Sequence, residues 1–187
     1  MAPKPEINKQ LEMLKCIIMI QEAFRDFDIK KLREITNKCE KNILIEEHLF
    51  FSLALLSYTL SKILQKSRYK NERFYQSITI QLSRAVQFAK NGDEVSLVGA
   101  IEKILDIIVT YDEKEKRYII SLIEKGRTKI AASLYAQGLS LSRVITITGA
   151  QKQEVLDYSG KTVMSDRAGK TISVKDRLRN AKEILKD

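Results

Sequence analysis

Proline is missing from almost the whole chain, and this constrains the fold more than any other feature of the sequence. Both prolines, Pro3 and Pro5, lie in the first five residues, and the 187 residues include only 7 glycines. Proline and glycine are the residues that destabilise a helix interior most. Their scarcity favours long helices, and we therefore expect an all-α fold.

Apolar residues recur at three- and four-residue intervals through most of the first 126 residues, which is the spacing of one helix face. This spacing predicts helices over residues 8–27, 45–65 and 71–90, another that Asp28 caps, and one that begins at Asp93. The helix over 45–65 is apolar on most faces and is expected to be central. Short connections between these helices predict a bundle of five or six helices over residues 1–126.

Two positions mark expected helix boundaries in this part of the chain. Asn91-Gly92 fits a C-terminal stop. Asp112 with Glu115 has the form of a capping box, which predicts that a new helix starts there and can continue through Gly126.

Residues 128–158 have the pattern of three short helices separated by two glycine-containing turns. Ser140 follows Gly138 and fits an N-cap, and Gly149 can end the second helix because glycine tolerates positive φ. This order is that of a helix-turn-helix motif. It predicts a helix-turn-helix-like module over residues 127–187. The β-branched run at 144–147 leaves a strand open as an alternative.

The composition of the sequence changes after Tyr158. Two short β-prone runs around a polar turn, within residues 159–172, predict a short extended or hairpin segment. Ser173 and Asp176 then fit the start of a C-terminal helix with Val174, Leu178 and Leu185 on one face.

The net charge of +9 is unevenly distributed along the chain. Residues 1–126 contain 21 basic and 18 acidic side chains, whereas residues 127–187 contain 12 basic and 6 acidic ones. The last third therefore carries +6 of the excess, which fits an anionic partner at that end. Plain solubility accounts for an excess of this size equally well.

The module contains residues of the types that contact nucleic acids. In a helix-turn-helix protein, the first residues of the third helix face base edges, and here these are Gln151, Lys152 and Gln153. Glutamine can pair with adenine and lysine with guanine or phosphate, and Arg143 would approach the groove beside them. Phosphate contacts are expected from cationic residues that follow the third helix: Lys161, Arg167, Lys170, Arg177 and Arg179.

Acidic residues of the same helix oppose this interpretation. Glu154 and Asp157 give residues 151–158 a net charge of −1, which is unfavourable for phosphate contact. The alternative is a non-catalytic protein-interaction or dimerisation module without a nucleic-acid role, and a homodimer is one form that it would take. On that reading, apolar residues such as Leu139, Leu141 and Ile147 would be buried against a partner.

A second candidate for nucleic-acid contact is the stretch from Lys62 to Tyr75. It interleaves five basic residues with Tyr69, Phe74 and Tyr75, which could neutralise phosphates and stack bases. An ordinary polar loop whose aromatic side chains pack inward explains the same pattern, and we favour that reading.

The sequence gives little support for catalysis. Gly-Lys-Thr occurs at residues 160–162 and 169–171, but a phosphate-binding loop needs a glycine five residues earlier, where Val155 and Met164 stand. His48 is the only histidine, so metal-ligand spacing with Cys16 and Cys39 is missing. We expect a protein that is not an enzyme and requires no cofactor or metal.

Cellular location is indicated by three features. The longest nearly uncharged run, residues 49–61, is too short to span a bilayer, and the first residues lack a secretory signal pattern. Cys16 and Cys39 fall on apolar helix faces, as buried thiols in a reducing compartment do. We therefore expect a cytoplasmic protein that does not enter a membrane.

The C-terminal third also resembles a family of archaeal helical proteins of uncharacterised function. The matching residues form a motif that includes Ala132, Tyr135, Gly138 and Thr148-Gly149, followed by Tyr158, Gly160, Lys161 and Thr162. The resemblance is specific over residues 127–187. It implies an archaeal, cytoplasmic source and a helix-turn-helix-like module, and it transfers no catalytic residue.

Overall fold

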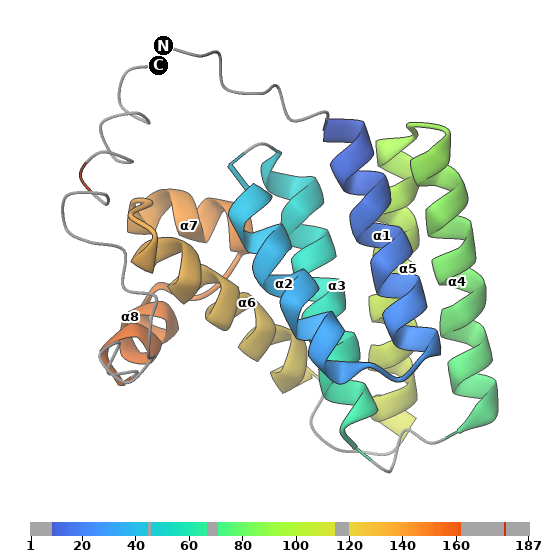
Figure 1. The fold of residues 1–187 in the computed structure, drawn as a ribbon. Helices are drawn as coiled ribbons and strands as arrows, with labels where there is room; N and C mark the ends of the chain where they lie inside the picture. Colours follow the sequence, from blue (N-terminus) through green and yellow to red (C-terminus); the bar gives the residue numbers. More distant parts are fainter. Residues whose placement is uncertain (1–8, 45, 67–70, 115–119, 162–177, 179–187) are drawn as a thin grey trace. The chain divides into compact units, whose positions relative to one another are not determined.

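The computed structural model describes residues 9–44, 46–66, 71–114, 120–161 and 178. This part of the chain is all-helical, which confirms the predicted fold class (Figure 1). Contacts within the chain divide it into an N-terminal unit, Met1–Ile123, and a C-terminal unit, Glu124–Asp187. The helices are α1 Lys9–Arg25, α2 Ile29–Asn42, α3 Glu47–Leu64, α4 Glu72–Lys90, α5 Glu94–Lys114, α6 Ile120–Ala136, α7 Leu141–Thr148 and α8 Lys152–Lys161.

The N-terminal unit is a bundle of α1 to α5 (Figure 1). Helix α1 packs against α2, α3 and α4, while α3 also packs against α2 and α5, and α4 against α5. Burial extends along α3 from Leu49 to Ile63 and includes Phe50, Leu53 and Leu60. The expectation that this helix is central is therefore confirmed. Its apolar side chains on several faces require neighbours on several sides.

Polar side chains cap two helix starts in the bundle; the sequence predicts the cap at Asp28 but not the cap at Asn71. The Asp28 carboxylate accepts the backbone N–H of Lys31 at the start of α2, and the Asn71 side chain accepts that of Phe74 at the start of α4. Gly92 follows α4 with φ of 71°, a conformation that glycine adopts without steric cost. These bonds satisfy backbone groups that a helix end leaves without intrahelical partners.

The predicted helix start at Asp112 is wrong. Asp112 lies inside α5, which continues to Lys114. Ile101, Ile104 and Ile108 of α5 are buried at helical spacing, and this packing outweighs the modest preference of a capping box for a helix start.

In the C-terminal unit, α7 and α8 follow the end of α6. Helix α6 runs through Gly126, in agreement with the sequence prediction. The run at 144–147 is helical, so the strand alternative is wrong, because Val144 and Ile147 point into the core one turn apart. Gly138 and Gly149 have positive φ values of 106° and 65° and allow the chain to turn before and after α7. The core of the unit contains Ile130, Leu134, Leu139, Val144, Ile147 and Val155.

The predicted extended or hairpin segment and C-terminal helix fall almost entirely on residues 162–177 and 179–187, which lie outside the described residues.

Candidate nucleic-acid interface

The start of α7 is set by its N-cap. The Ser140 hydroxyl accepts the backbone N–H of Arg143 at 3.3 Å, as the sequence predicts. The bond orients the first turn of α7, in which Ser142 and Arg143 are exposed. The cap therefore places the Arg143 side chain on the solvent side of the module.

The turn between α7 and α8 is held by hydrogen bonds around Thr148. The Thr148 hydroxyl donates to the Val144 carbonyl at 2.8 Å and accepts the Ala150 N–H at 3.2 Å. From α6, Arg127 Nη1 donates to the Thr148 carbonyl at 2.8 Å. A cation at the C-terminal end of a helix also interacts favourably with the helix dipole. Arg127 therefore fixes the direction in which α8 leaves the turn.

Helix α8 presents its first residues to solvent. Gln151, Lys152 and Gln153 are all exposed, whereas Val155 is fully buried and anchors the helix. The three positions that the sequence proposed for base contact are therefore open to solvent, as Arg143 on α7 also is. The Gln153 amide is already engaged, since its Nε2 donates to Asp157 Oδ1 at 2.9 Å.

The two acidic residues of α8 are bonded within the module. Glu154 Oε2 accepts the Thr128 hydroxyl of α6 at 2.9 Å, and Asp157 accepts the Gln153 amide. Both side chains stay exposed to solvent, so these acids still oppose the binding of a polyanion at this helix.

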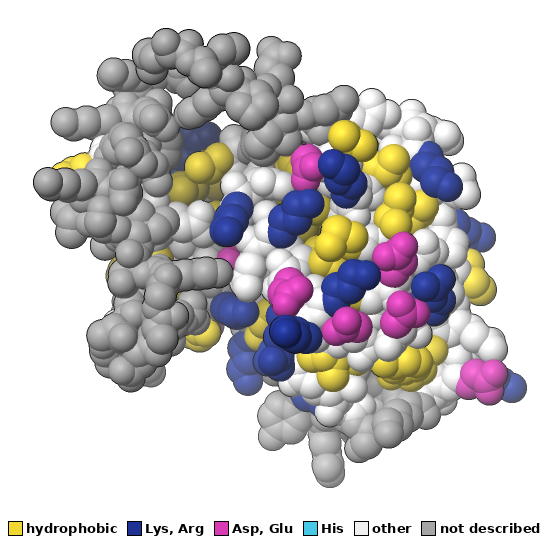
Figure 2. All heavy atoms as spheres, viewed as in Figure 1, with side chains coloured by type: hydrophobic (Ala, Val, Ile, Leu, Met, Phe, Trp, Pro, Cys, Tyr) yellow, Lys and Arg dark blue, Asp and Glu magenta, His cyan; other side chains and the backbone are white. Residues whose placement is uncertain are grey.

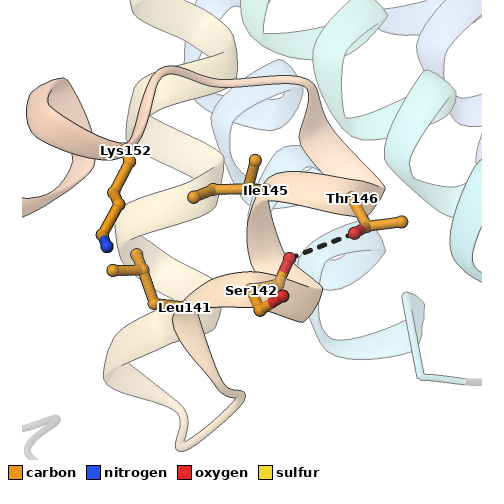
Figure 3. Close-up of a pocket in the computed structure, with 5 residues that line it drawn as sticks. All are labelled: Leu141, Ser142, Ile145, Thr146 and Lys152. Atoms are coloured by element: carbon orange, nitrogen blue, oxygen red, sulfur yellow. Dashed lines mark hydrogen bonds between the residues drawn. The ribbon is translucent and has the colours of Figure 1, made fainter.

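A hollow of about 280 Å³ lies between α7 and the first turn of α8 (Figure 3). Leu141, Ser142, Ile145 and Thr146 line it from α7, and Lys152 lines it from α8. Figure 3 shows the Lys152 side chain beside Leu141, and the Thr146 hydroxyl bonded to the Ser142 carbonyl, at 3.1 Å. The site thus combines one ammonium, two half-buried apolar side chains and two hydroxyl residues.

Sequence reasoning missed Ser142 and Thr146 as site residues. Their four-residue spacing on α7, parallel to that of Leu141 and Ile145, was a usable signal, because residues four apart share a helix face. Their proximity to Lys152 depends on how α7 and α8 pack, which local sequence does not reveal.

Two residues that the interaction-module alternative placed on an exposed face are buried. Leu139 and Ile147 are 3% and 4% exposed in the single chain, so that part of the alternative is wrong. Leu141 stays half-buried at the hollow.

Of the five proposed phosphate-binding residues, only Lys161 belongs to the described part of the chain. Arg167, Lys170, Arg177 and Arg179 lie outside the described residues. Lys161 is the last residue of α8. The first Gly-Lys pair therefore lies at the C-terminal end of a helix, whereas a phosphate-binding loop precedes a helix N-terminus.

The basic and aromatic stretch from Lys62 to Tyr75 has inward-facing aromatic rings where it is described. Phe74 is 4% exposed and its ring centroid lies 4.4 Å from that of Tyr111. Tyr75 packs against Phe24 at 5.5 Å, and burial raises the pKa of its hydroxyl. This confirms the favoured reading for these two rings; Tyr69 lies outside the described residues.

His48 and possible metal ligands are the other candidates that the sequence raised for a chemical site. His48 is exposed at the start of α3, and within the described ranges no group of three potential metal ligands comes together. On the visible face of the N-terminal unit, Lys and Arg side chains are interspersed with Asp and Glu (Figure 2). Ion pairs within the N-terminal unit include Lys38–Glu12 at 2.9 Å and Lys31–Glu22 at 3.3 Å.

None of the helices in the described part of the chain combines the length and the apolar character that crossing a bilayer requires.

Comparisons with known proteins give no match: no family model, no curated protein and no solved structure is significantly similar to this chain.

Proposed function

We propose that this chain is a non-catalytic nucleic-acid-binding protein of the helix-turn-helix type, acting as a regulator or as a ribonucleoprotein accessory. The observation that carries the proposal is the exposure of Gln151, Lys152 and Gln153 together at the start of α8. Helix α8 would be the recognition helix and α7 the helix before it.

Each exposed residue has a distinct role in this proposal. Gln151 and Gln153 would read base edges, and Gln153 would exchange its bond to Asp157 for a bond to adenine. Lys152 and Arg143 are cations placed for guanine or phosphate. Ser142 and Thr146 add hydroxyls beside Lys152 that can bond phosphate oxygens.

The charge of the C-terminal third supports the same partner. Half of its excess of +6 comes from residues 162–187, and the residues that would hold phosphates are Lys161 at the end of α8 and, after it, Arg167, Lys170, Arg177 and Arg179. Phosphate contacts release counterions, so binding should weaken steeply as salt rises.

The test is a titration of the full chain with mixed-sequence DNA and RNA, followed by fluorescence anisotropy at several salt concentrations. We expect the double variant Lys161→Ala with Lys170→Ala to weaken binding to all sequences and to lower the slope of log affinity against log salt by about two. Gln153→Ala should instead change sequence preference.

The matched control replaces two exposed lysines of the N-terminal unit, Lys30→Ala with Lys103→Ala, and removes the same charge. This control should leave the slope within about half a unit of the unmodified chain, because only phosphate-contacting cations enter it. Equal effects of the two double variants, or no binding at low salt, would refute the proposal.

A homodimerisation or protein-interaction module is the second candidate, and the half-buried Leu141 and Ile145 at the hollow favour it. Under this proposal, Leu141→Glu with Ile145→Glu would convert a dimer to a monomer in sedimentation experiments. A chain that is already monomeric at high concentration would exclude the dimer.

A further inference from the structure

The hollow between α7 and α8 has an apolar surface that the proposed contacts to nucleic acid leave unused. Leu141 and Ile145 are four positions apart on α7, so they share one face of the helix, and each keeps part of its surface exposed to solvent. The other described residues that line the hollow are Ser142, Thr146 and Lys152, and Lys152 lies beside Leu141 (Figure 3). A partner that fits this hollow should therefore offer an apolar group and a negative charge side by side.

The hollow is large enough for the edge of a nucleobase. Its volume is about 280 Å³. A cavity of about 150 Å³ that is lined by aliphatic side chains already accepts a benzene ring. The edge of a base can therefore enter between α7 and the first turn of α8, and an apolar group on that edge can contact Leu141 and Ile145.

The charge of the lining favours a polyanion over a second copy of this chain. Lys152 is the only charged residue among those that the structure describes at the hollow. Two copies that met here about a two-fold axis would bring identical surfaces together, and with them their two Lys152 ammonium groups. Like charges that face each other weaken association, and the net charge of +9 adds to the repulsion. A phosphate backbone would instead be attracted to the same lysine.

The residue that precedes Lys152 indicates which base would supply the apolar group. Gln151 is exposed immediately before α8, and glutamine pairs with adenine in the major groove through the N6 and N7 atoms of the base. The partner of adenine in DNA is thymine, whose C5-methyl group is the apolar group that the major groove displays. The glutamine and the apolar surface of the hollow thus fit the two bases of one A·T pair.

We propose that the hollow lined by Leu141 and Ile145 receives the C5-methyl group of a thymine while Lys152 pairs with a phosphate, so that the partner of this chain is duplex DNA. The inference rests on the proposed nucleic-acid function and specifies its partner. Uracil lacks this methyl group, and the major groove of duplex RNA is too deep and narrow for side chains to read. Both properties select DNA over RNA.

The size of one methyl group determines the size of the expected effect. Transfer of a single methyl group from water to an apolar surface strengthens binding about fourfold. The methyl group carries no charge, so its contribution should be the same at every salt concentration, whereas the contribution of the phosphates falls as salt rises. Salt dependence therefore separates the methyl contact from the phosphate contacts.

The experiment compares short DNA duplexes of random A·T sequence that contain either thymine or deoxyuridine, together with RNA duplexes of the same sequences. The full chain is titrated with each duplex, and fluorescence anisotropy reports binding at several salt concentrations. We expect the thymine DNA to bind about fourfold more tightly than the deoxyuridine DNA, with equal slopes of log affinity against log salt. The RNA duplexes should bind no more tightly than the deoxyuridine DNA, because neither offers the methyl group.

Truncation of the hollow tests where the methyl group is received. Leu141→Ala with Ile145→Ala removes apolar surface but no charge, so the ratio of the two DNA affinities should fall from about four toward one while the salt slope stays the same. The matched control is Leu44→Ala with Leu156→Ala, which shortens two leucines that are 50% and 36% exposed and do not line the hollow. This control should keep the ratio, and circular dichroism verifies the helical content of both double variants.

The outcomes that would overturn this inference are distinct from the failure of the proposed function. Steeply salt-dependent binding with equal affinity for thymine and deoxyuridine DNA, or with tighter binding to RNA, would remove the thymine contact and leave the nucleic-acid function standing. An unchanged ratio in Leu141→Ala with Ile145→Ala would show that the methyl group is received elsewhere. A dimer that Leu141→Glu with Ile145→Glu converts to monomers would show that a second copy occupies the hollow. Only the absence of binding to every duplex at low salt would refute the proposed function as well.

Discussion

The N-terminal unit is held by long helices that bury apolar side chains on several faces, whereas the C-terminal unit depends on how its short helices begin and end. Helix α3 has 18 residues and is buried from Leu49 to Ile63, while α7 and α8 have 8 and 10 residues. Isolated helices that short are marginal in water. The comparison shows that side-chain volume should govern stability in the bundle, and backbone geometry should govern it after Ile123.

The largest loss of stability should follow the removal of a large core side chain in the bundle. Phe50 is fully buried in α3, and Phe50→Ala should lower the free energy of unfolding by about 3–5 kcal/mol, because a cavity replaces the ring. Val155→Ala, which truncates the buried anchor of α8, should cost roughly 1.5–2.5 kcal/mol. Urea denaturation measures both, and a larger loss for Val155→Ala would reverse the comparison.

A backbone substitution in the C-terminal unit should produce a smaller effect than either core truncation. Gly149 has φ of 65°, and a Cβ added there would lie 3.0 Å from Arg127 Nη1. Gly149→Ala should therefore cost about 1–2 kcal/mol of left-handed strain and disturb the bond from Arg127 to Thr148. Hydrogen exchange of the α7 and α8 amides, followed by mass spectrometry, should report the loss.

The matched control for this substitution lies in the bundle. At Gly99 in α5, an added Cβ meets nothing within 4 Å, so Gly99→Ala should stabilise the helix by up to about 1 kcal/mol. If both alanine variants shift stability in the same direction, backbone conformation is not what distinguishes these positions.

Loss of the α7 cap should have a smaller effect. Ser140→Ala removes the acceptor for the Arg143 N–H and should cost about 1 kcal/mol, seen as faster exchange in the first turn of α7. Ser142→Ala is the same change two residues later, where the side chain is exposed and no cap depends on it. Alanine favours helices, so that variant should be neutral or slightly more stable.

The smallest effect should come from an ion pair of the bundle. Hydrogen bonds from Lys38 and Lys15 hold the pKa of Glu12 below its ordinary value of 4.5. The folded state therefore gains stability from ionised Glu12 above pH 4.5 and loses it as the pH falls through the lowered pKa. Glu12→Gln should remove this acid-sensitive contribution, which is less than about 1 kcal/mol for a surface pair.

Denaturation midpoints between pH 3 and pH 7 would detect the difference, with Glu34→Gln on the exposed side of α2 as the control. A parallel pH profile for Glu12→Gln and the unmodified chain would show that the pairs with Lys15 and Lys38 add nothing.

Much of the fold could be predicted because helix ends are determined by neighbouring residues. Asp28, Asn91-Gly92, Ser140 and Gly149 act where the sequence placed them. The start at Asp112 was wrong because the packing of α5 overrides a local preference. Apolar spacing identified which residues face inward, but it did not show whether a partner or the chain itself covers Leu139 and Ile147.

Less of the candidate site could be predicted, since its geometry depends on residues far apart in the sequence. The sequence identified Gln151, Lys152 and Gln153 as exposed candidates, and their exposure is confirmed. From the sequence, Arg127 counted only as one of the positive charges of residues 127–187. In the structure its side chain donates a hydrogen bond to the carbonyl of Thr148, 21 positions later. The bond between Thr128 and Glu154 spans 26 positions and leaves no local pattern to detect.

The position of Val155 has a consequence for how α8 would meet a partner. From Lys152 to Gly160, it is the only residue classed as buried. A helix that buries a single side chain in this stretch should open and close many times before the bundle unfolds, and each opening frees its amides for exchange. A bound polyanion would then reduce the frequency of these openings. The free energy needed to order α8 would be subtracted from the free energy of binding, so the observed affinity would be lower than for a rigid helix.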